Sequence, residues 1–81
     1  MRLISEDKKI NISFDNWDIE ISSPYINPPI YYIKATSSSR SICLASCKNM
    51  LEALYVLNEI QKHHSSGLKE CRLSDIIKKN P

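Results

Sequence analysis

Residues 49–63 constrain the fold of this chain most strongly, because they have the pattern of a capped amphipathic helix. Asn49 is a favourable N-cap, and Glu52, three residues later, completes a capping box. Apolar residues then follow with the spacing of one helical face, at Met50, Ala53, Leu54, Leu57 and Ile60. Three more widen this face and indicate a second contact: Leu51, Tyr55 and Val56. One helix cannot bury such a face alone, so other elements must cover it.

Short strands are the covering surface that the sequence predicts. Four segments have the alternating or β-rich pattern of strands, at residues 10–15, 17–22, 30–36 and 41–47. Polar turns separate a short apolar run at Leu3, the segment 10–15 and the segment 17–22 from one another. These three pieces should therefore form two adjacent hairpins. The last two segments should form a longer hairpin at the sheet centre. We therefore expect a single α+β domain over residues 1–81, an antiparallel sheet of about four to five strands packed against one long helix.

Two stretches do not fit this sheet. Residues 22–29 contain three prolines, which remove main-chain donors and favour a loop with polyproline character. The tail after Gly67 has two interpretations. Ser74 is placed to cap a short terminal helix, whereas residues 68–73 fit a strand equally well.

Composition bounds the class of protein. With 81 residues, a net charge of +2 and 42% hydrophobic residues, the chain matches a small globular domain. Gly67 is the single glycine, which excludes a glycine-rich phosphate-binding loop. No stretch approaches the roughly 18 apolar residues of a membrane span, and the N-terminus lacks the pattern of a signal peptide. We therefore expect a soluble protein of the cytoplasm.

The three cysteines, Cys43, Cys47 and Cys71, are an odd number, as expected in a reducing compartment. On a regular strand Cys43 and Cys47 share a face about 13 Å apart, too far for a disulfide. We expect small buried side chains rather than nucleophiles, because burial raises the pKa of a thiol.

The other polar residues form no catalytic or metal pattern. His63 and His64 project about 100° apart on a helix, so they suit the negative end of the helix dipole better than a metal ion. Asp18 and Glu20 share a strand face about 7 Å apart, a common arrangement on solvated strands. We therefore expect no catalytic residue, no metal and no cofactor, in a protein that is not an enzyme.

Binding residues are predicted around the longer hairpin, at Tyr31, Tyr32, Arg40 and Trp17. Tyr31 and Tyr32 are neighbours on a strand and must point to opposite faces, and one helix leaves one sheet face partly uncovered. Aromatic and β-branched residues on such a face are typical of an interface. The pattern predicts a homo-oligomer, or a surface for another protein or for a nucleotide whose base stacks on tyrosine while Arg40 holds a phosphate.

A small nucleic-acid-binding accessory protein is the alternative function. Its cations would be Lys8, Lys9, Lys34, Arg40, Lys78 and Lys79. These residues fall in separate turns and termini rather than in one stripe, which argues against nucleic acid as the partner.

Two motifs carry a family resemblance. One is the run Met1-Arg2-Leu3-Ile4-Ser5-Glu6-Asp7 with Ile10-Asn11-Ile12, and the other is the capped helix that begins at Asn49. Over residues 1–63 the chain thereby resembles small uncharacterised phage and prophage proteins of Gram-positive bacteria. Lys8 stands where that family has a turn glycine, and Asn49 where it has a threonine cap.

The resemblance implies a context rather than a chemistry. Small non-enzymatic phage proteins often occupy the surface of a host protein, or sequester a nucleotide signal used in antiviral defence. The expectation is an interaction protein, a candidate inhibitor of host defence in the host-cell cytoplasm. No functional residue is assigned by this resemblance.

Overall fold

The computed structural model describes residues 1–23 and 30–79. The strands in this part of the chain are β1 (Arg2–Ile4), β2 (Asn11–Ser13), β3 (Asp18–Ser22), β4 (Tyr31–Ser37), β5 (Arg40–Cys47) and β6 (Glu70–Arg72). The helices are α1 (Met50–Ser65), α2 (Leu73–Lys79) and a single 3-10 turn, η1 (Phe14–Asn16). Most of the proline-containing loop predicted at residues 22–29 lies outside the described residues.

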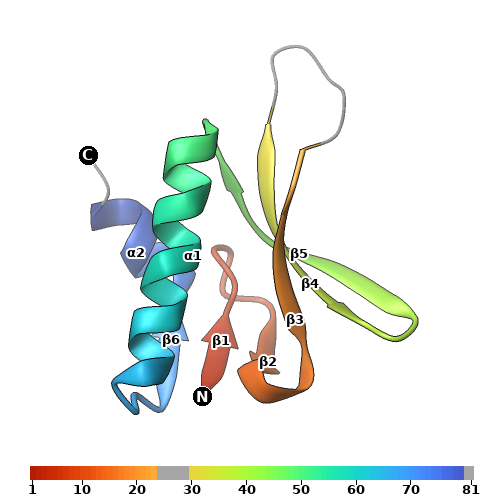
Figure 1. Ribbon diagram of the computed structural model, residues 1–81, viewed down its shortest axis with the longest axis vertical. Helices are drawn as coiled ribbons and strands as arrows, with labels where there is room; N and C mark the ends of the chain where they lie inside the picture. The colour runs from red at the N-terminus through yellow and green to blue at the C-terminus, as the bar shows by residue number, and fades with distance from the viewer. Residues whose placement is uncertain (24–29, 80–81) are drawn as a thin grey trace.

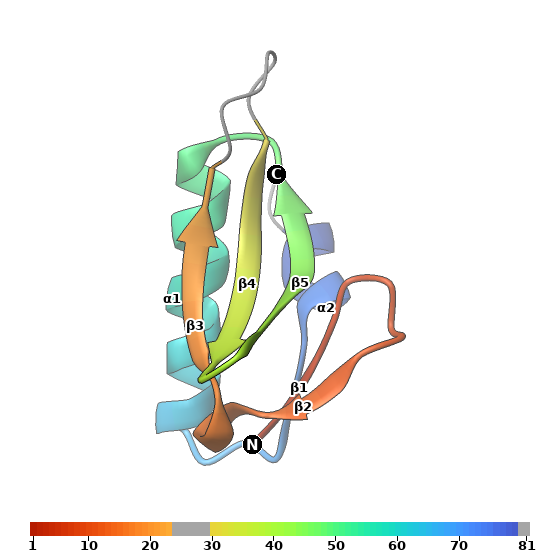
Figure 2. The same ribbon diagram turned by 90° about the vertical axis from the view of Figure 1, so that its right-hand side faces the viewer.

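The strands form two three-stranded sheets, ordered β2-β1-β6 and β3-β4-β5. Figures 1 and 2 show α1 lying along one side of the second sheet, with the first sheet below and beside it. The α+β class and the long helix in the C-terminal half are therefore confirmed. The strands are divided between two sheets, and one sheet is mixed because β6 runs parallel to β1.

The division into two sheets occurs at η1. The first predicted hairpin is confirmed, since β1 pairs with β2. The second is wrong, because Phe14–Asn16 coils into η1 and directs the chain away, so β3 pairs with β4 instead of β2. The longer hairpin is confirmed as β4 and β5, with β4 at the centre of its sheet.

The turn between β1 and β2 joins the two sheets. The main-chain N–H of Glu6 donates to the carbonyl of Leu44 on β5 at 2.8 Å, and its carboxylate accepts from Ser46 N at 3.2 Å. In the same turn Lys8 has a φ of 66°, the left-handed region that favours glycine.

The N-cap of α1 is confirmed. The side-chain oxygen of Asn49 accepts from the N–H of Glu52 at 2.8 Å, and the Glu52 carboxylate accepts from the N–H of Lys48 at 3.1 Å. The helix ends at Ser65, two residues beyond the predicted end. Gly67 follows with a φ of 74° and turns the chain towards β6.

Replacing Asn49 with alanine should lower the free energy of unfolding by about 1 kcal/mol, because the Glu52 N–H loses its acceptor. Urea unfolding followed by circular dichroism measures the loss. Asn58→Ala is the matched control, because Asn58 is exposed in the middle of α1 and alanine has the higher helix propensity. In the monomer the control should be neutral or slightly stabilising, and an equal loss in both variants would contradict the capping role.

Both interpretations of the tail hold in part. Residues 70–72 form β6, and the helix predicted after it is α2. Ser74 is inside α2 rather than at its cap, and its hydroxyl is buried with no hydrogen-bond partner among the described residues. The strand exists because β1 offers its open edge, where Leu3 lies opposite Cys71 and both side chains are buried.

The core lies where α1 meets both sheets and α2. Ala53, Val56 and Ile60 of α1 have no exposed surface. They form one apolar cluster with buried residues of the other elements, among them Leu3, Ile33, Ala35, Leu44, Leu73 and Ile76. Covering this cluster from several sides makes a three-layered arrangement possible in a chain of 81 residues.

A bulge in β5 changes the placement of two cysteines. The register shifts at Ile33 and Lys34, so that Leu44 and Ala45 are consecutive and both buried. Cys43 and Cys47 therefore do not share a face as predicted. Cys47 is buried, as expected, whereas Cys43 is exposed.

Candidate functional site

The four predicted binding residues lie in three places. The Arg40 guanidinium lies 5.9 Å from the centre of the Trp17 ring, at the end of the sheet where β4 turns into β5. Tyr31 and Tyr32 begin β4, about 20 Å away along the strand. The structure thus brings Trp17 and Arg40 together and leaves the tyrosines apart from them.

The two tyrosines point to opposite faces of the sheet. Tyr31 is on the same side as the fully buried Ile33 and packs partly against the core. Tyr32 is on the outer side, opposite Ser22 and Ser46. Replacing Tyr31 would therefore disturb packing as well as any surface.

The outer face of this sheet differs from the predicted interface. Its positions alternate with the buried ones and are occupied by Asp18, Glu20, Ser22, Tyr32, Lys34, Thr36, Ser41, Cys43 and Ser46. Glu20 lies directly opposite Lys34. Tyr32 is the single aromatic residue in the described part of this face, and Asp18 and Glu20 are exposed. The face is therefore a solvated polar surface.

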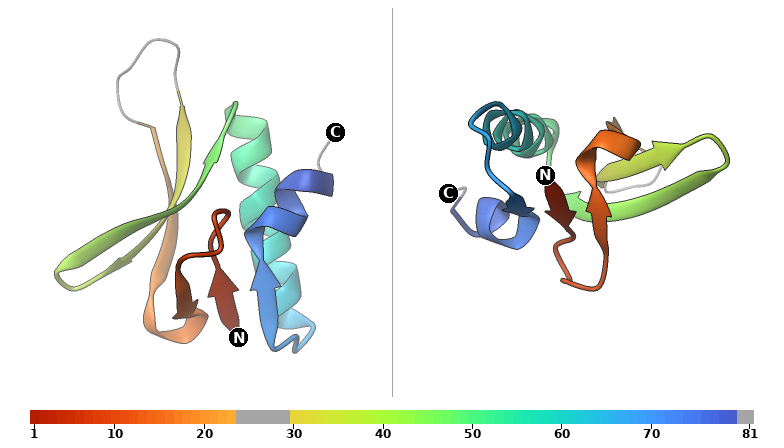
Figure 3. Two further views of the ribbon diagram at one scale, coloured as in Figure 1. Left: turned by 180° about the vertical axis from the view of Figure 1, so that it is seen from behind. Right: turned by 90° about the horizontal axis from the view of Figure 1, so that it is seen from below.

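A hollow of about 480 Å³ lies beside β6, between α1 and α2, and we call it the β6 groove. Its lining residues are Tyr55, Glu59 and His63 of α1, Leu68, Glu70, Arg72, and Asp75 and Ile76 of α2. Figure 3 shows β6 at the margin of its sheet, flanked there by the two helices. Leu68 is 47% exposed, so the groove has an apolar wall open to solvent.

The open edge of β6 faces this groove. On its other side β6 pairs with β1, where Arg2 N donates to the Lys69 carbonyl at 2.8 Å and Leu3 lies opposite Cys71. Main-chain groups alternate along a strand, so those of Glu70 and Arg72 point away from β1. Among the described residues no strand pairs with this second edge.

The charge of the β6 groove is predominantly negative. Three carboxylates, those of Glu59, Glu70 and Asp75, face one guanidinium, that of Arg72. Arg72 Nε donates a hydrogen bond to Glu70 Oε1 at 2.5 Å. This hydrogen bond and the nearby Asp75 raise the pKa of Arg72. Partial burial raises the pKa of Tyr55, and a hydrogen bond to Glu59 raises it further by a smaller amount. A cation is therefore favoured in this groove over an anion.

The solvent side of α1 is the second surface with an unusual composition. Leu51 is 79% exposed, and Leu54 and Met50 are 44% and 42% exposed. Further along the same side lie the exposed residues Asn58, Gln61 and Ser65. We call Leu51, Leu54, Asn58, Gln61 and Ser65 the α1 stripe. Met50 and Leu54 were predicted on the core-facing side of the helix, and their exposure corrects that prediction. Of the three extra apolar residues, Leu51 lies in the stripe, whereas Val56 is in the core and Tyr55 lines the β6 groove.

The cysteines have different environments. Burial raises the pKa of Cys47 and of Cys71 to about 11, and neighbouring carboxylates add to the effect. Both thiols are thus protonated at neutral pH and enclosed by the core. Cys43 is on the outer face of its sheet, with its Sγ 3.5 Å from the carbonyl of Ala45.

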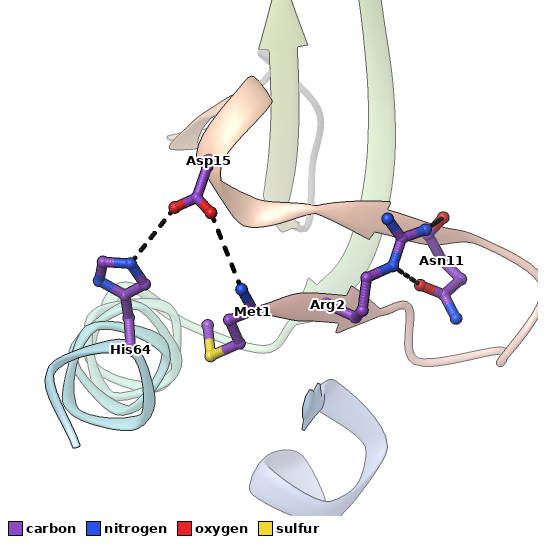
Figure 4. A network of polar contacts seen from close by, with 5 residues as sticks. All are labelled: Met1, Arg2, Asn11, Asp15 and His64. Atoms are coloured by element: carbon purple, nitrogen blue, oxygen red, sulfur yellow. Dashed lines mark hydrogen bonds and ion pairs between the residues drawn. The ribbon is translucent and has the colours of Figure 1, made fainter. Parts of the chain in front are cut away.

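The two histidines pack at the end of α1, as the dipole interpretation expected. His63 Nδ1 lies 2.6 Å from the carbonyl of Glu59. The His64 ring stacks on Phe14 with 4.6 Å between centroids, and its Nε2 is 3.3 Å from Asp15. Figure 4 shows Asp15 between His64 and the amino group of Met1, which is 3.9 Å away. These contacts fasten η1 to α1.

Within residues 1–23 and 30–79 no group of three or more His, Cys, Asp or Glu side chains is arranged to hold a metal ion. The helices in these ranges lack the length and apolar content to span a membrane. Comparison of the chain with known families, with curated proteins and with solved structures gives no significant match.

Proposed function

We propose that this chain is a non-catalytic binding protein that recognises an extended, basic segment of another protein in the β6 groove. The observation that carries the proposal is the open edge of β6 beside a hollow with three carboxylates and an exposed leucine. An unpaired strand edge offers main-chain donors and acceptors, and neighbouring pockets for side chains select among segments.

Main-chain pairing would supply sequence-independent affinity. An added strand would use the outward N–H groups of Glu70 and Arg72 and the Glu70 carbonyl, because the Arg72 carbonyl accepts the first hydrogen bond of α2. Pairing therefore extends over at most the three residues of β6. Such a short pairing is weak by itself, because a bound segment must also be ordered. Side-chain contacts must therefore contribute much of the affinity.

Side chains of the groove define what those contacts accept. Alternate residues of an added strand point to the same side, so one set of them would face the helices. Leu68 and Ile76 favour an apolar anchor there, and Glu59 and Asp75 favour Lys or Arg beside it. Phosphates would be repelled by the same carboxylates, so this site favours a protein segment over a nucleotide or a nucleic acid.

The phage resemblance supplies the context of the proposal. A small protein that binds a host protein stoichiometrically inhibits it by occupying its surface, and turnover is not needed. We propose a host protein of antiviral defence as the partner class and the host cytoplasm as the location. The basic segment would be exposed on that partner.

A labelled six-residue peptide of alternating Lys and Val is the probe for this function. Fluorescence anisotropy should show binding with a dissociation constant on the order of 0.1 mM, and a Glu–Val peptide of equal length should not bind. Leu68→Lys should weaken binding by about tenfold or more, because it removes the apolar wall and adds a repelling cation. Leu51→Lys makes the same substitution at an exposed leucine outside the groove and should leave binding unchanged.

The same pair of variants identifies a natural partner. Wild-type protein, Leu68→Lys and Leu51→Lys are used as baits in host lysate, with quantitative mass spectrometry of what each retains. A partner of the groove is retained by wild type and by Leu51→Lys and is depleted with Leu68→Lys. Equal binding of the Lys–Val and Glu–Val peptides, together with equal capture by all three baits, would refute the proposed function.

A further inference from the structure

The α1 stripe has the spacing of a coiled-coil seam. Its members follow at intervals of three, four, three and four residues: Leu51, Leu54, Asn58, Gln61 and Ser65. This is the a and d pattern of two heptads, with leucine at the first a and d positions and asparagine at the next a position. The face of α1 that packs on the core, with Ala53, Val56 and Ile60, is on the opposite side of the helix. The seam is therefore additional to the core.

Charge is absent from the stripe, although a solvent-facing helix normally carries it. The whole chain is 25% charged, yet all five stripe residues are neutral. Depletion of charged residues distinguishes the centre of an interface from the rest of a protein surface. All five stripe residues are exposed, and Figures 1 and 3 show α1 at the outside of the molecule. The stripe is thus accessible to a second helix.

We propose that two copies of this chain form a parallel dimer through the α1 stripe. A two-fold axis along the helices places Leu51 against Leu51, Leu54 against Leu54 and Asn58 against Asn58. Apolar groups then meet apolar groups, and the two amides hydrogen-bond to each other, as a buried asparagine at an a position does in parallel dimers. The antiparallel alternative centred on Asn58 would place Leu51 against Ser65 and Leu54 against Lys62, which leaves both leucines beside polar side chains.

The flanking positions agree with the parallel arrangement. Met50 of one copy would approach Tyr55 of the other, and Leu57 would approach the aliphatic stem of Lys62. No like charges are brought together at these four positions. A hollow of about 550 Å³ that borders Asn58, Gln61 and Ser65 gives room for side chains of the facing helix. The surface is therefore complementary to itself, as a two-fold interface requires.

The size of the contact sets its strength. Five stripe residues with two flanking apolar ones make a smaller interface than the roughly 20–30 residues a side of a standard complex. We therefore expect a reversible dimer with a dissociation constant in the micromolar to submillimolar range. The dimer presents two β6 grooves, but it depends on a different surface from the proposed binding function.

Sedimentation equilibrium of the purified chain tests the dimer. Wild type should follow a monomer–dimer equilibrium, and Leu51→Lys should raise its dissociation constant at least tenfold, because two lysines would then face each other across the axis. Leu68→Lys is the matched control and should dimerise like wild type. Asn58→Leu should tighten association by tenfold or more, or shift it to larger oligomers, because the amide that restricts the seam is lost.

A cysteine at the end of the seam tests the orientation. In a Cys43→Ser background, Ser65→Cys should form a disulfide-linked dimer on mild oxidation, because the two positions 65 meet only when the helices are parallel. A monomeric wild type at millimolar concentration, or unchanged association of Leu51→Lys, overturns the dimer. Failure of Ser65→Cys to crosslink while wild type dimerises overturns the parallel arrangement. Peptide binding to the β6 groove is measured separately, so either idea can fail alone.

Discussion

Ile60→Ala should lower the free energy of unfolding by about 2–5 kcal/mol and leave a substantial unfolded fraction at 37 °C. Ile60 has no exposed surface and packs where α1 meets both sheets. Truncation removes buried methylene groups and leaves a cavity among closely packed core side chains, which can relax only partly to fill it. Small domains have roughly 0.05–0.15 kcal/mol of stability per residue, so this loss is a large fraction of the total.

Urea unfolding monitored by circular dichroism gives the comparison. Alanine is the best helix former, so the loss cannot be attributed to weaker α1 propensity. Leu54→Ala is the control on the same helix, because Leu54 is 44% exposed and its truncation should cost less than about 1 kcal/mol in the monomer. A loss for Ile60→Ala no greater than that of the control would show that α1 does not pack as described.

Thiol labelling should modify one cysteine of the folded protein rapidly and the other two slower by about a hundredfold or more. Cys43 is exposed, whereas Cys47 and Cys71 are buried and have their pKa raised to about 11. At pH 8 a thiol of that pKa is only about 0.1% thiolate, against roughly a quarter for a free cysteine, and the core also blocks access. Mass spectrometry after iodoacetamide treatment should show one label in native buffer and three in denaturant.

The same two thiols make stability depend on alkaline pH. A raised pKa means that the folded state holds the proton more tightly than the unfolded state does. Each thiol therefore stabilises the folded state fully below about pH 9, the pKa of a cysteine in the unfolded state. This stabilisation, about 1–3 kcal/mol for each thiol, is lost as the pH rises towards the folded-state pKa of about 11. A Cys47→Ala, Cys71→Ala double variant should lose less stability than wild type over this range. Rapid labelling of all three native cysteines would contradict their assigned burial.

Local sequence signals were sufficient for the elements that depend on local interactions. The Asn49 cap, the helix α1 and the β4–β5 hairpin follow from spacing and turn residues within a few positions of one another. The face of α1 that packs on the core was predicted only in part, because Met50 and Leu54 are exposed and Val56 is buried. The pairing of β1 with β6 joins residues nearly seventy positions apart, as Leu3 and Cys71 show. The sequence allowed a strand at residues 68–73 but did not show its partner, so the sheet β2-β1-β6 could not be anticipated.

The candidate sites show the same limit. The sequence indicated a second contact of α1 through Leu51, Tyr55 and Val56, but of these three residues only Leu51 lies in the α1 stripe. It did not indicate the β6 groove, since Glu59, Glu70 and Asp75 converge only after β6 has paired with β1. The polar outer face around Tyr32 was also missed. The bulge at Leu44 and the strand register decide which residues face outward, and alternation alone does not reveal them.

The most direct test of the proposed function is a titration of ¹⁵N-labelled protein with the Lys–Val peptide, followed by amide NMR. The largest shifts should occur at the amides of Glu70 and Arg72, with smaller ones at Leu68 and Ile76, because an added strand bonds to the open edge of β6. Shifts centred on Tyr31, Tyr32, Trp17 and Arg40 would assign binding to the sequence-predicted residues instead. That result, or an unchanged spectrum at millimolar peptide, would contradict recognition in the β6 groove.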